Sequence, residues 1–147
     1  MNTALLRKLK DKLPSYEEFE VDFFELIYTK NKQRDKKVIQ YILEKFMGRN
    51  INGLPIDYTS ASIEHVLAQS KGDEEIVGSI GNLILVDKIT NSEELKNFDF
   101  MKKIEILKEK NYPLDEHLLK ATQWTENEIK DRAKSMSHKA YYEIWNL

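Results

Sequence analysis

The stretch that decides the fold runs from Ser62 to Asp87 and reads SIEHVLAQSKGDEEIVGSIGNLILVD. Its two ends, Ser62–Leu67 and Asn82–Asp87, are short and rich in β-branched and aliphatic residues, which is typical of strands. The polar segment between them, Gln69–Ser79, is typical of a connection. We therefore predict two short strands in the middle of the chain.

The chain before this stretch has helical periodicity. Leucines at helical spacing predict a first helix that ends at Pro14, and the capping-box pattern of Ser15 and Glu18 predicts the start of a second. A third apolar stripe predicts a helix from about Asp35 to Gly48. Between Gly48 and Ser62 the pattern breaks, which indicates an irregular loop.

Helical periodicity returns after Asn91. Phe100, Ile104 and Leu107 stand at i, i+4 and i+7, and Pro113 is expected to open a short helix. A second capping box, formed by Thr125 and Glu128, predicts the start of a C-terminal helix. Trp124 and Trp145 lie in apolar helical patterns, so a core position is favoured for both over stacking on bases.

The pattern as a whole predicts an α+β fold that is mostly α-helical, with a small ββα unit enclosed by helices. We expect one domain over residues 1–147, because this length is that of a typical single domain. Within it we expect a helical N-terminal part over residues 1–48, a ββα core over 58–110 and C-terminal helices over 113–147.

Composition narrows the chemistry. The chain has no cysteine, so a metal site must use oxygen and imidazole ligands, and disulfides are excluded. It has neither a long apolar run nor a signal-peptide pattern, so we expect a soluble cytoplasmic protein without membrane contact. It also has no phosphate-cradling glycine motif, so nucleotide hydrolysis is not expected.

Charge gives two interpretations of one segment, which we call the basic strip. The net charge of -2 argues against a surface built throughout for nucleic acid. A local cluster can still meet a phosphate backbone, because salt screens acids farther away than about 8 Å. The alternative is a solvated loop that leads into a helix. The basic strip consists of Lys30, Lys32, Arg34, Lys36 and Lys37.

Four polar residues in the order Glu64-His65, Asn82 and Asn91 suggest phosphodiester hydrolysis. His65 can act as a base, because a neutral imidazole is available near neutral pH. The carboxylate of Glu64 and the amide oxygen of Asn91 are ligands that Mg²⁺ or Mn²⁺ prefers. Taken alone, Asn82 is also typical of a turn after Gly81, and Asn91 is also typical of a helix cap.

These residues resemble the HNH signature of ββα-metal nucleases, as in the HNH domain of CRISPR effector nucleases. The closer resemblance is to the C-terminal domain of GmrSD-type restriction endonucleases, and it covers most of the chain. That family commonly has proline three residues after the catalytic histidine, where this chain has Ala68. The stretches that carry the resemblance are Ile63-Glu64-His65, Ile80-Gly81-Asn82-Leu83, Asn91, Phe100 with Lys103, Trp124-Thr125, Ile129 with Arg132, and Ile144-Trp145.

The resemblance implies a metal-dependent DNA endonuclease of a restriction or anti-phage system, with His65 as the base and Asn82 orienting its imidazole. One site per chain would cut one strand. The implied partners are DNA, including modified phage DNA, and an N-terminal nucleotide-dependent domain or subunit for which 147 residues leave no room. Lys103 and Arg132 are further candidate DNA contacts, separate from the basic strip. The alternatives are a non-catalytic DNA-binding or interaction module with the same fold, and a nuclease that acts on RNA.

Overall fold

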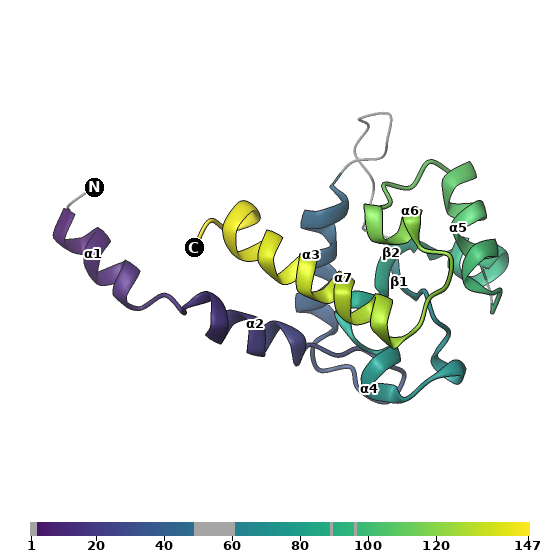
Figure 1. The fold of residues 1–147 in the computed structure, drawn as a ribbon, viewed down its shortest axis with the longest axis horizontal. Coiled ribbons are helices and arrows are strands. Elements are labelled where there is room, and N and C mark those ends of the chain that lie inside the picture. Colours follow the sequence, from purple (N-terminus) through teal and green to yellow (C-terminus); the bar gives the residue numbers. More distant parts are fainter. Residues whose placement is uncertain (1–2, 49–60, 89, 96) are drawn as a thin grey trace.

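The computed structural model describes residues 3–48, 61–88, 90–95 and 97–147. In this part of the chain the fold is mostly helical, with one two-stranded antiparallel sheet, as the α+β prediction requires. Figure 1 shows helices around the sheet and α1 extending away from the rest of the molecule. The elements are α1 (Thr3–Asp11), α2 (Tyr16–Phe24), α3 (Lys36–Met47), β1 (Ala61–His65), α4 (Glu74–Val77), β2 (Leu83–Asp87), α5 (Phe100–Glu109), α6 (Glu116–Lys120) and α7 (Glu126–Lys139).

The caps predicted from the sequence are present. The Ser15 side chain accepts a hydrogen bond from the Glu18 amide at the start of α2, and Thr125 and Glu128 form the capping box that starts α7. Gly48 follows α3 with a positive φ of 36°, which glycine adopts without steric cost. These caps could be predicted from the sequence because their hydrogen bonds join residues that are only a few positions apart.

The two strands pair in antiparallel register, with Ala61 opposite Asp87 and His65 opposite Leu83. All of β2 except Asp87 is buried, because α3 packs on the strand and Arg132 of α7 reaches the Leu83 carbonyl. α7 also packs against α2 and against the turn Ile80–Asn82. The sheet is therefore held inside the helices, and its β1 end at His65 is fixed from several sides.

Two glycines allow close backbone contacts beside the sheet. A Cβ on Gly81 would lie 2.1 Å from the Ile129 carbonyl oxygen, so only glycine lets α7 approach the turn before β2. A Cβ on Gly78 would lie 2.6 Å from side-chain carbons of both Ile27 and Thr29. Gly78 thus lets the segment between α2 and α3 lie against the connection between the strands.

Some expected elements differ from those observed. The polar connection between the strands contains α4, whose single turn is too short to give a periodic signal. Pro113 does not open α6, because Asp115 caps that helix by accepting a hydrogen bond from the Leu118 amide. The loop expected after Gly48, and the start of the 58–110 unit, lie among residues 49–60, outside the described residues.

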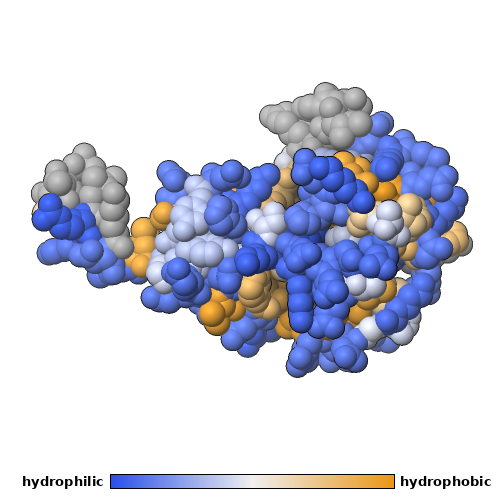
Figure 2. All heavy atoms as spheres, viewed as in Figure 1, coloured by the Kyte–Doolittle hydropathy of each residue, from blue (hydrophilic) through white to orange (hydrophobic). Residues whose placement is uncertain are grey.

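The visible face in Figure 2 is mostly hydrophilic, with separate apolar patches. None of the helices in the described ranges has the length and apolar character needed to cross a membrane.

Candidate active site

A cavity of about 470 Å³ lies at the end of β1. It is bordered by residues from β1, from the segment between α2 and α3, and from the first turns after each strand. Three of the four residues singled out in the sequence, Glu64, His65 and Asn91, line it together. The remaining lining residues are Tyr28, Ser62, Ile63, Ala68, Gln69, Ser70, Asn97 and Lys103.

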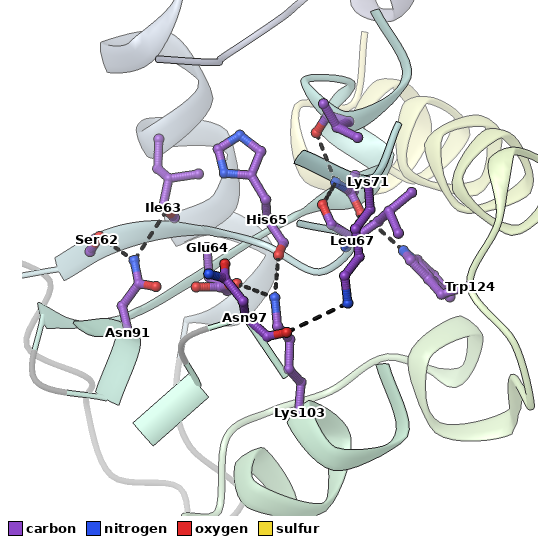
Figure 3. Close-up of polar contacts among 12 residues, drawn as sticks. Ser62, Ile63, Glu64, His65, Leu67, Lys71, Asn91, Asn97, Lys103 and Trp124 are labelled. Atoms are coloured by element: carbon purple, nitrogen blue, oxygen red, sulfur yellow. Dashed lines mark hydrogen bonds and ion pairs between the residues drawn. The ribbon is translucent and has the colours of Figure 1, made fainter. Parts of the chain in front are cut away.

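The Glu64 and His65 side chains leave β1 on opposite sides, as neighbours in a strand do (Figure 3). Asn91 and Lys103 lie on the Glu64 side. His65 is the last residue of β1, and both residues line the cavity. They do so from opposite sides of the strand, so the carboxylate and the imidazole do not lie side by side.

The His65 ring is held by the segment between α2 and α3. Its Nε2 lies 2.8 Å from the Tyr28 carbonyl oxygen, and the Tyr28 ring stacks on the imidazole with centroids 5.6 Å apart. Tyr28 is itself fixed by a 2.9 Å hydrogen bond from its amide to the Gly78 carbonyl. The close approach permitted by Gly78 thus delivers an acceptor to the ring.

This contact sets the protonation of His65. A carbonyl oxygen can only accept a hydrogen bond, so Nε2 carries the proton and the lone pair of the neutral ring is on Nδ1. Burial lowers the pKa of His65 and the Lys103 charge adds to this, while the hydrogen bond to Tyr28 acts in the opposite direction. At neutral pH the ring is therefore an uncharged base with Nδ1 as its acceptor atom.

Glu64 is buried, with 5% of its surface exposed, and pairs with Lys103. The Lys103 Nζ lies 2.8 Å from Glu64 Oε1 and 2.9 Å from the His65 carbonyl oxygen. Burial raises the pKa of Glu64, and the Lys103 charge and hydrogen bond counteract part of that shift. Glu64 thus lines the cavity, and its carboxylate is already paired with the Lys103 ammonium.

Asn91 is the second residue of the π-helical segment Thr90–Leu95, which follows β2. Its Nδ2 lies 2.7 Å from the Ser62 hydroxyl and 3.5 Å from the Ile63 carbonyl oxygen. Both contacts use Nδ2, and no described residue donates a hydrogen bond to the Oδ1 atom. Figure 3 shows that oxygen turned toward Glu64.

Asn82 is fully buried and does not hold the imidazole directly, contrary to the role expected for it. Its Nδ2 donates to the Leu67 and Val77 carbonyls, and its Oδ1 accepts from the Leu67 amide and from Trp124 Nε1. The amide thus fixes the backbone two residues after His65. Trp124, which is 5% exposed, has the core position that its pattern favoured.

Lys103 and Arg132 cannot contact DNA as expected, because they are only 1% and 3% exposed. The Arg132 guanidinium donates to the Gly81 and Leu83 carbonyls at 3.0 and 2.9 Å and pairs with Asp115 at 2.7 Å. It joins α7 to the turn before β2 and to the start of α6. Lysine and arginine are mostly exposed, so the sequence suggested that Lys103 and Arg132 lie on the surface. No residue near either one in the sequence indicates the buried oxygen atoms that accept their hydrogen bonds.

The basic strip is exposed along its whole length and lies next to the cavity. Lys36 Nζ stands 5.6 Å from the centre of the Tyr28 ring, and the Lys30 amide donates to Gln69 Oε1 at 2.8 Å. Tyr28 and Gln69 both line the cavity. The strip therefore lies on the surface beside the cavity.

The residues that line the cavity supply oxygen donors rather than a dense ligand cluster. Within the described ranges, three or more histidine or acidic side chains do not gather closely enough to hold a metal ion. Glu64 and Asn91 would give two protein oxygens, which is the ligand type and low ligand number that Mg²⁺ accepts beside water and phosphate. The donor set fits such an ion, apart from the contact that Lys103 makes with Glu64.

Comparison with known protein families shows that residues 13–139 match the family described as GmrSD restriction endonucleases, C-terminal domain. The chain belongs to this family. The match includes every element from α2 to α7 and thus the whole cavity, whereas α1 precedes it. No curated protein matches the chain.

Several cavity residues of this GmrSD C-terminal domain were missed in the sequence. The contact between Tyr28 and His65 could not be predicted, because it uses a backbone carbonyl, which every residue has, and joins residues 37 positions apart. Gln69 and Ser70 follow β1 by four and five residues, and their polar character close to His65 was the signal that could have identified them. Asn97, whose carbonyl oxygen lies 3.5 Å from Lys71 Nζ, carried no such signal.

Proposed function

We propose that this GmrSD C-terminal domain is a metal-dependent DNA endonuclease of the HNH type, with His65 as its general base. The observation that carries the proposal is the contact between His65 Nε2 and the Tyr28 carbonyl, because it leaves Nδ1 as the acceptor atom of a residue that lines a polar cavity. A general base needs a neutral ring at working pH, and the lowered pKa of His65 supplies it.

The arrangement supports a ββα unit made of β1, β2 and the segment Thr90–Leu95. These elements contribute Glu64 and His65 from the end of one strand and Asn91 from the helical segment. Asn82 and Trp124 fix the backbone between His65 and α4, so the end of β1 is rigid although Ala68 replaces the proline common in the family. Asn82 is therefore a positioning residue.

Glu64 and Asn91 are the residues that would hold the metal, which we expect to be Mg²⁺ or Mn²⁺. When bound, a divalent ion stabilises negative charge on the phosphate and on the departing oxygen. Asn91 would use its Oδ1 atom, while its Nδ2 stays on Ser62. Ser62 lies on β1 two residues before Glu64, so the two ligands are fixed to the same strand.

His65 would accept a proton on Nδ1 from a water molecule in the cavity. The water oxygen forms a new bond to phosphorus, the bond from phosphorus to one ester oxygen breaks, and that oxygen takes a proton from solvent. One cavity of this kind per chain would cut one strand, which makes nicked DNA the first product. The basic strip would hold the phosphate backbone beside the cavity.

The substrate we propose is DNA, including modified phage DNA, within a restriction or anti-phage system. An N-terminal nucleotide-dependent domain or subunit would choose the target. A second candidate, a non-catalytic DNA-binding module, is favoured by one observation: Lys103 already neutralises the carboxylate that the metal needs. The two candidates make opposite predictions about the role of His65.

The test is incubation of the protein with supercoiled plasmid and Mg²⁺ or Mn²⁺. We expect nicked and then linear plasmid, with no cleavage in the presence of a chelator. His65→Ala should reduce the rate by about 10²- to 10⁴-fold, which is the usual contribution of a positioned base. The matched control is His138→Ala, because His138 is exposed on α7 and packs against Tyr16 and Tyr142 outside the cavity.

Both histidine variants should keep the circular dichroism spectrum of the wild type. Equal nicking by the wild type and His65→Ala would show that the cavity does not catalyse the cleavage. The enzyme hypothesis would then be rejected in favour of the non-catalytic DNA-binding module. Cleavage that persists in chelator would reject the metal requirement while keeping the nuclease.

A further inference from the structure

Lys103 is the most deeply buried charged side chain at the cavity. Its exposed fraction is 1%, and it reaches from α5 to the end of β1. Two of its three N–H donors are taken by Glu64 Oε1 and by the His65 carbonyl oxygen. Figure 3 shows the ammonium between these two oxygens, on the Asn91 side of β1.

An ammonium in this position makes contacts of the kind that a metal ion makes. It is a cation between a carboxylate oxygen and a carbonyl oxygen at hydrogen-bond distance, and it borders the same cavity as Asn91. Its burial is tolerated because both acceptors are fixed and one of them is charged. Among the described residues, Lys103 is the cation paired with Glu64.

A divalent ion and this ammonium cannot both use the carboxylate without strong repulsion. Charges of the same sign only a few ångströms apart repel strongly where burial limits screening by water. The side chain of Lys103 has four rotatable carbons, so the ammonium can move while α5 stays in place. Metal binding at Glu64 therefore requires the ammonium to leave Oε1.

We propose that Lys103 is a tethered cation that alternates with the divalent ion on Glu64, and so sets the metal affinity of the site. The inference rests on the proposed function, since it needs a metal at Glu64 and Asn91. In the metal-free protein Lys103 neutralises the carboxylate and holds it toward the cavity. When the ion binds, the ammonium leaves Oε1, while its hydrogen bond to the His65 carbonyl oxygen can remain. Lys103 is thus a positioning residue.

The first test measures Mn²⁺ binding by calorimetry, without DNA, in the wild type, Lys103→Met and Lys102→Met. Removing the competing charge should tighten Mn²⁺ binding to Lys103→Met by about tenfold or more, if the two cations exclude each other. Lys102 is the matched control, because it is the next residue of α5 but is half exposed and pairs with Glu105. Its affinity should equal that of the wild type. Equal or weaker binding by a folded Lys103→Met would overturn the proposal.

The second test uses the wild type, so it does not depend on a variant that folds. In nuclear magnetic resonance, a buried and hydrogen-bonded lysine ammonium exchanges slowly enough to give a signal. Mg²⁺ should shift or remove the Lys103 ammonium signal over the same concentrations that shift the Asn91 side-chain amide signal. Other lysine signals should not follow this curve.

The outcomes separate the two ideas. If the Asn91 signal responds to Mg²⁺ while the Lys103 signal does not, the alternation is wrong and the proposed metal site stands. If neither signal responds, the metal site of the proposed function fails, and the alternation fails with it.

Discussion

Asp87, the last residue of β2, holds the segment that carries Asn91. Its carboxylate accepts hydrogen bonds from the Thr90 amide at 2.9 Å, from the Thr90 hydroxyl at 2.6 Å and from the Tyr112 hydroxyl at 2.6 Å. Burial acts to raise the pKa of Asp87, but these hydrogen bonds outweigh it and lower the pKa to about 2. The carboxylate therefore favours the folded state while it is ionised.

The sign of this effect gives a prediction at the level of one residue. Because the folded pKa is below the ordinary value of 3.8, the stabilisation is present above about pH 4 and is lost as the pH falls toward 2. Urea unfolding of the wild type and Asp87→Asn should differ most at pH 6, and the difference should shrink below pH 4 and vanish only as the pH falls through about 2. Thr90→Val, which removes one donor, should lie between them at pH 6. A difference that stays constant over this range would contradict the assignment.

Side chains whose partners are distant in sequence were the ones that sequence analysis misplaced. Lys103 and Arg132 look like surface cations, yet their partners are backbone carbonyls and acids 17 to 51 positions away. Asn82 was recognised as part of the site, but its contacts to Leu67, Val77 and Trp124 give it a different role. Residue type suggested a chemistry for Glu64, His65 and Asn91, and only the fold shows that they share a cavity.

At the level of elements, the contact between α7 and the turn before β2 depends on Gly81. Substitution by alanine would place a Cβ 2.1 Å from the Ile129 carbonyl oxygen and 3.0 Å from the Ala133 amide nitrogen. Both atoms belong to the backbone of α7, so the clash can be relieved only by moving the helix. Moving α7 would also draw Arg132 away from the carbonyls of Gly81 and Leu83.

We therefore expect Gly81→Ala to lower the free energy of unfolding by about 1–3 kcal/mol or more, as overpacking does. The matched control is Gly72→Ala, because the nearest atom to its Cβ is a side-chain carbon of Val77 at 3.0 Å. Urea unfolding measures both. Comparable losses of stability in the two variants would show that the approach of α7 to Gly81 is not the source of the effect.

Helices and strands with a clear period or a local cap were predictable. α2 and α7 have caps closed within three residues, and β2 is a continuous apolar run, so each carries its own signal. α4 has four residues and α6 has five, which is too few to establish a period. The bridge between Ile27 and Ser79, which brings the N-terminal helices to the site, joins segments far apart in sequence.

For the molecule as a whole, charge is distributed unevenly. The net charge is -2, but the basic strip is exposed beside the cavity. The acidic groups elsewhere are largely screened at physiological salt beyond about 8 Å. A DNA backbone can therefore approach the His65 side of the molecule although the total charge is negative.

Replacing Lys36 and Lys37 by alanine should weaken DNA binding and reduce its salt dependence. If each lysine contacts one phosphate, the slope of log K against log salt should fall in magnitude by about 2. The control replaces Lys120 and Lys130, which are exposed on α6 and α7 and pair with Glu116 and Glu126. Fluorescence anisotropy with a short duplex at several salt concentrations measures the slopes. An unchanged slope would make the basic strip a solvated loop.

The hydrogen bond to His65 has a consequence for how substitutions can affect the proposed site. Its acceptor is the main-chain oxygen of position 28, which every amino acid possesses. Exchanging the phenol ring there would remove a stacking surface and a neighbour of Lys36, yet the tautomer would persist as long as the chain follows the same path. Substitution of Tyr28 is thus expected to leave the orientation of the His65 ring in place, whereas substitution of Gly78, which permits that path of the chain, is expected to disturb the ring that we propose as the base.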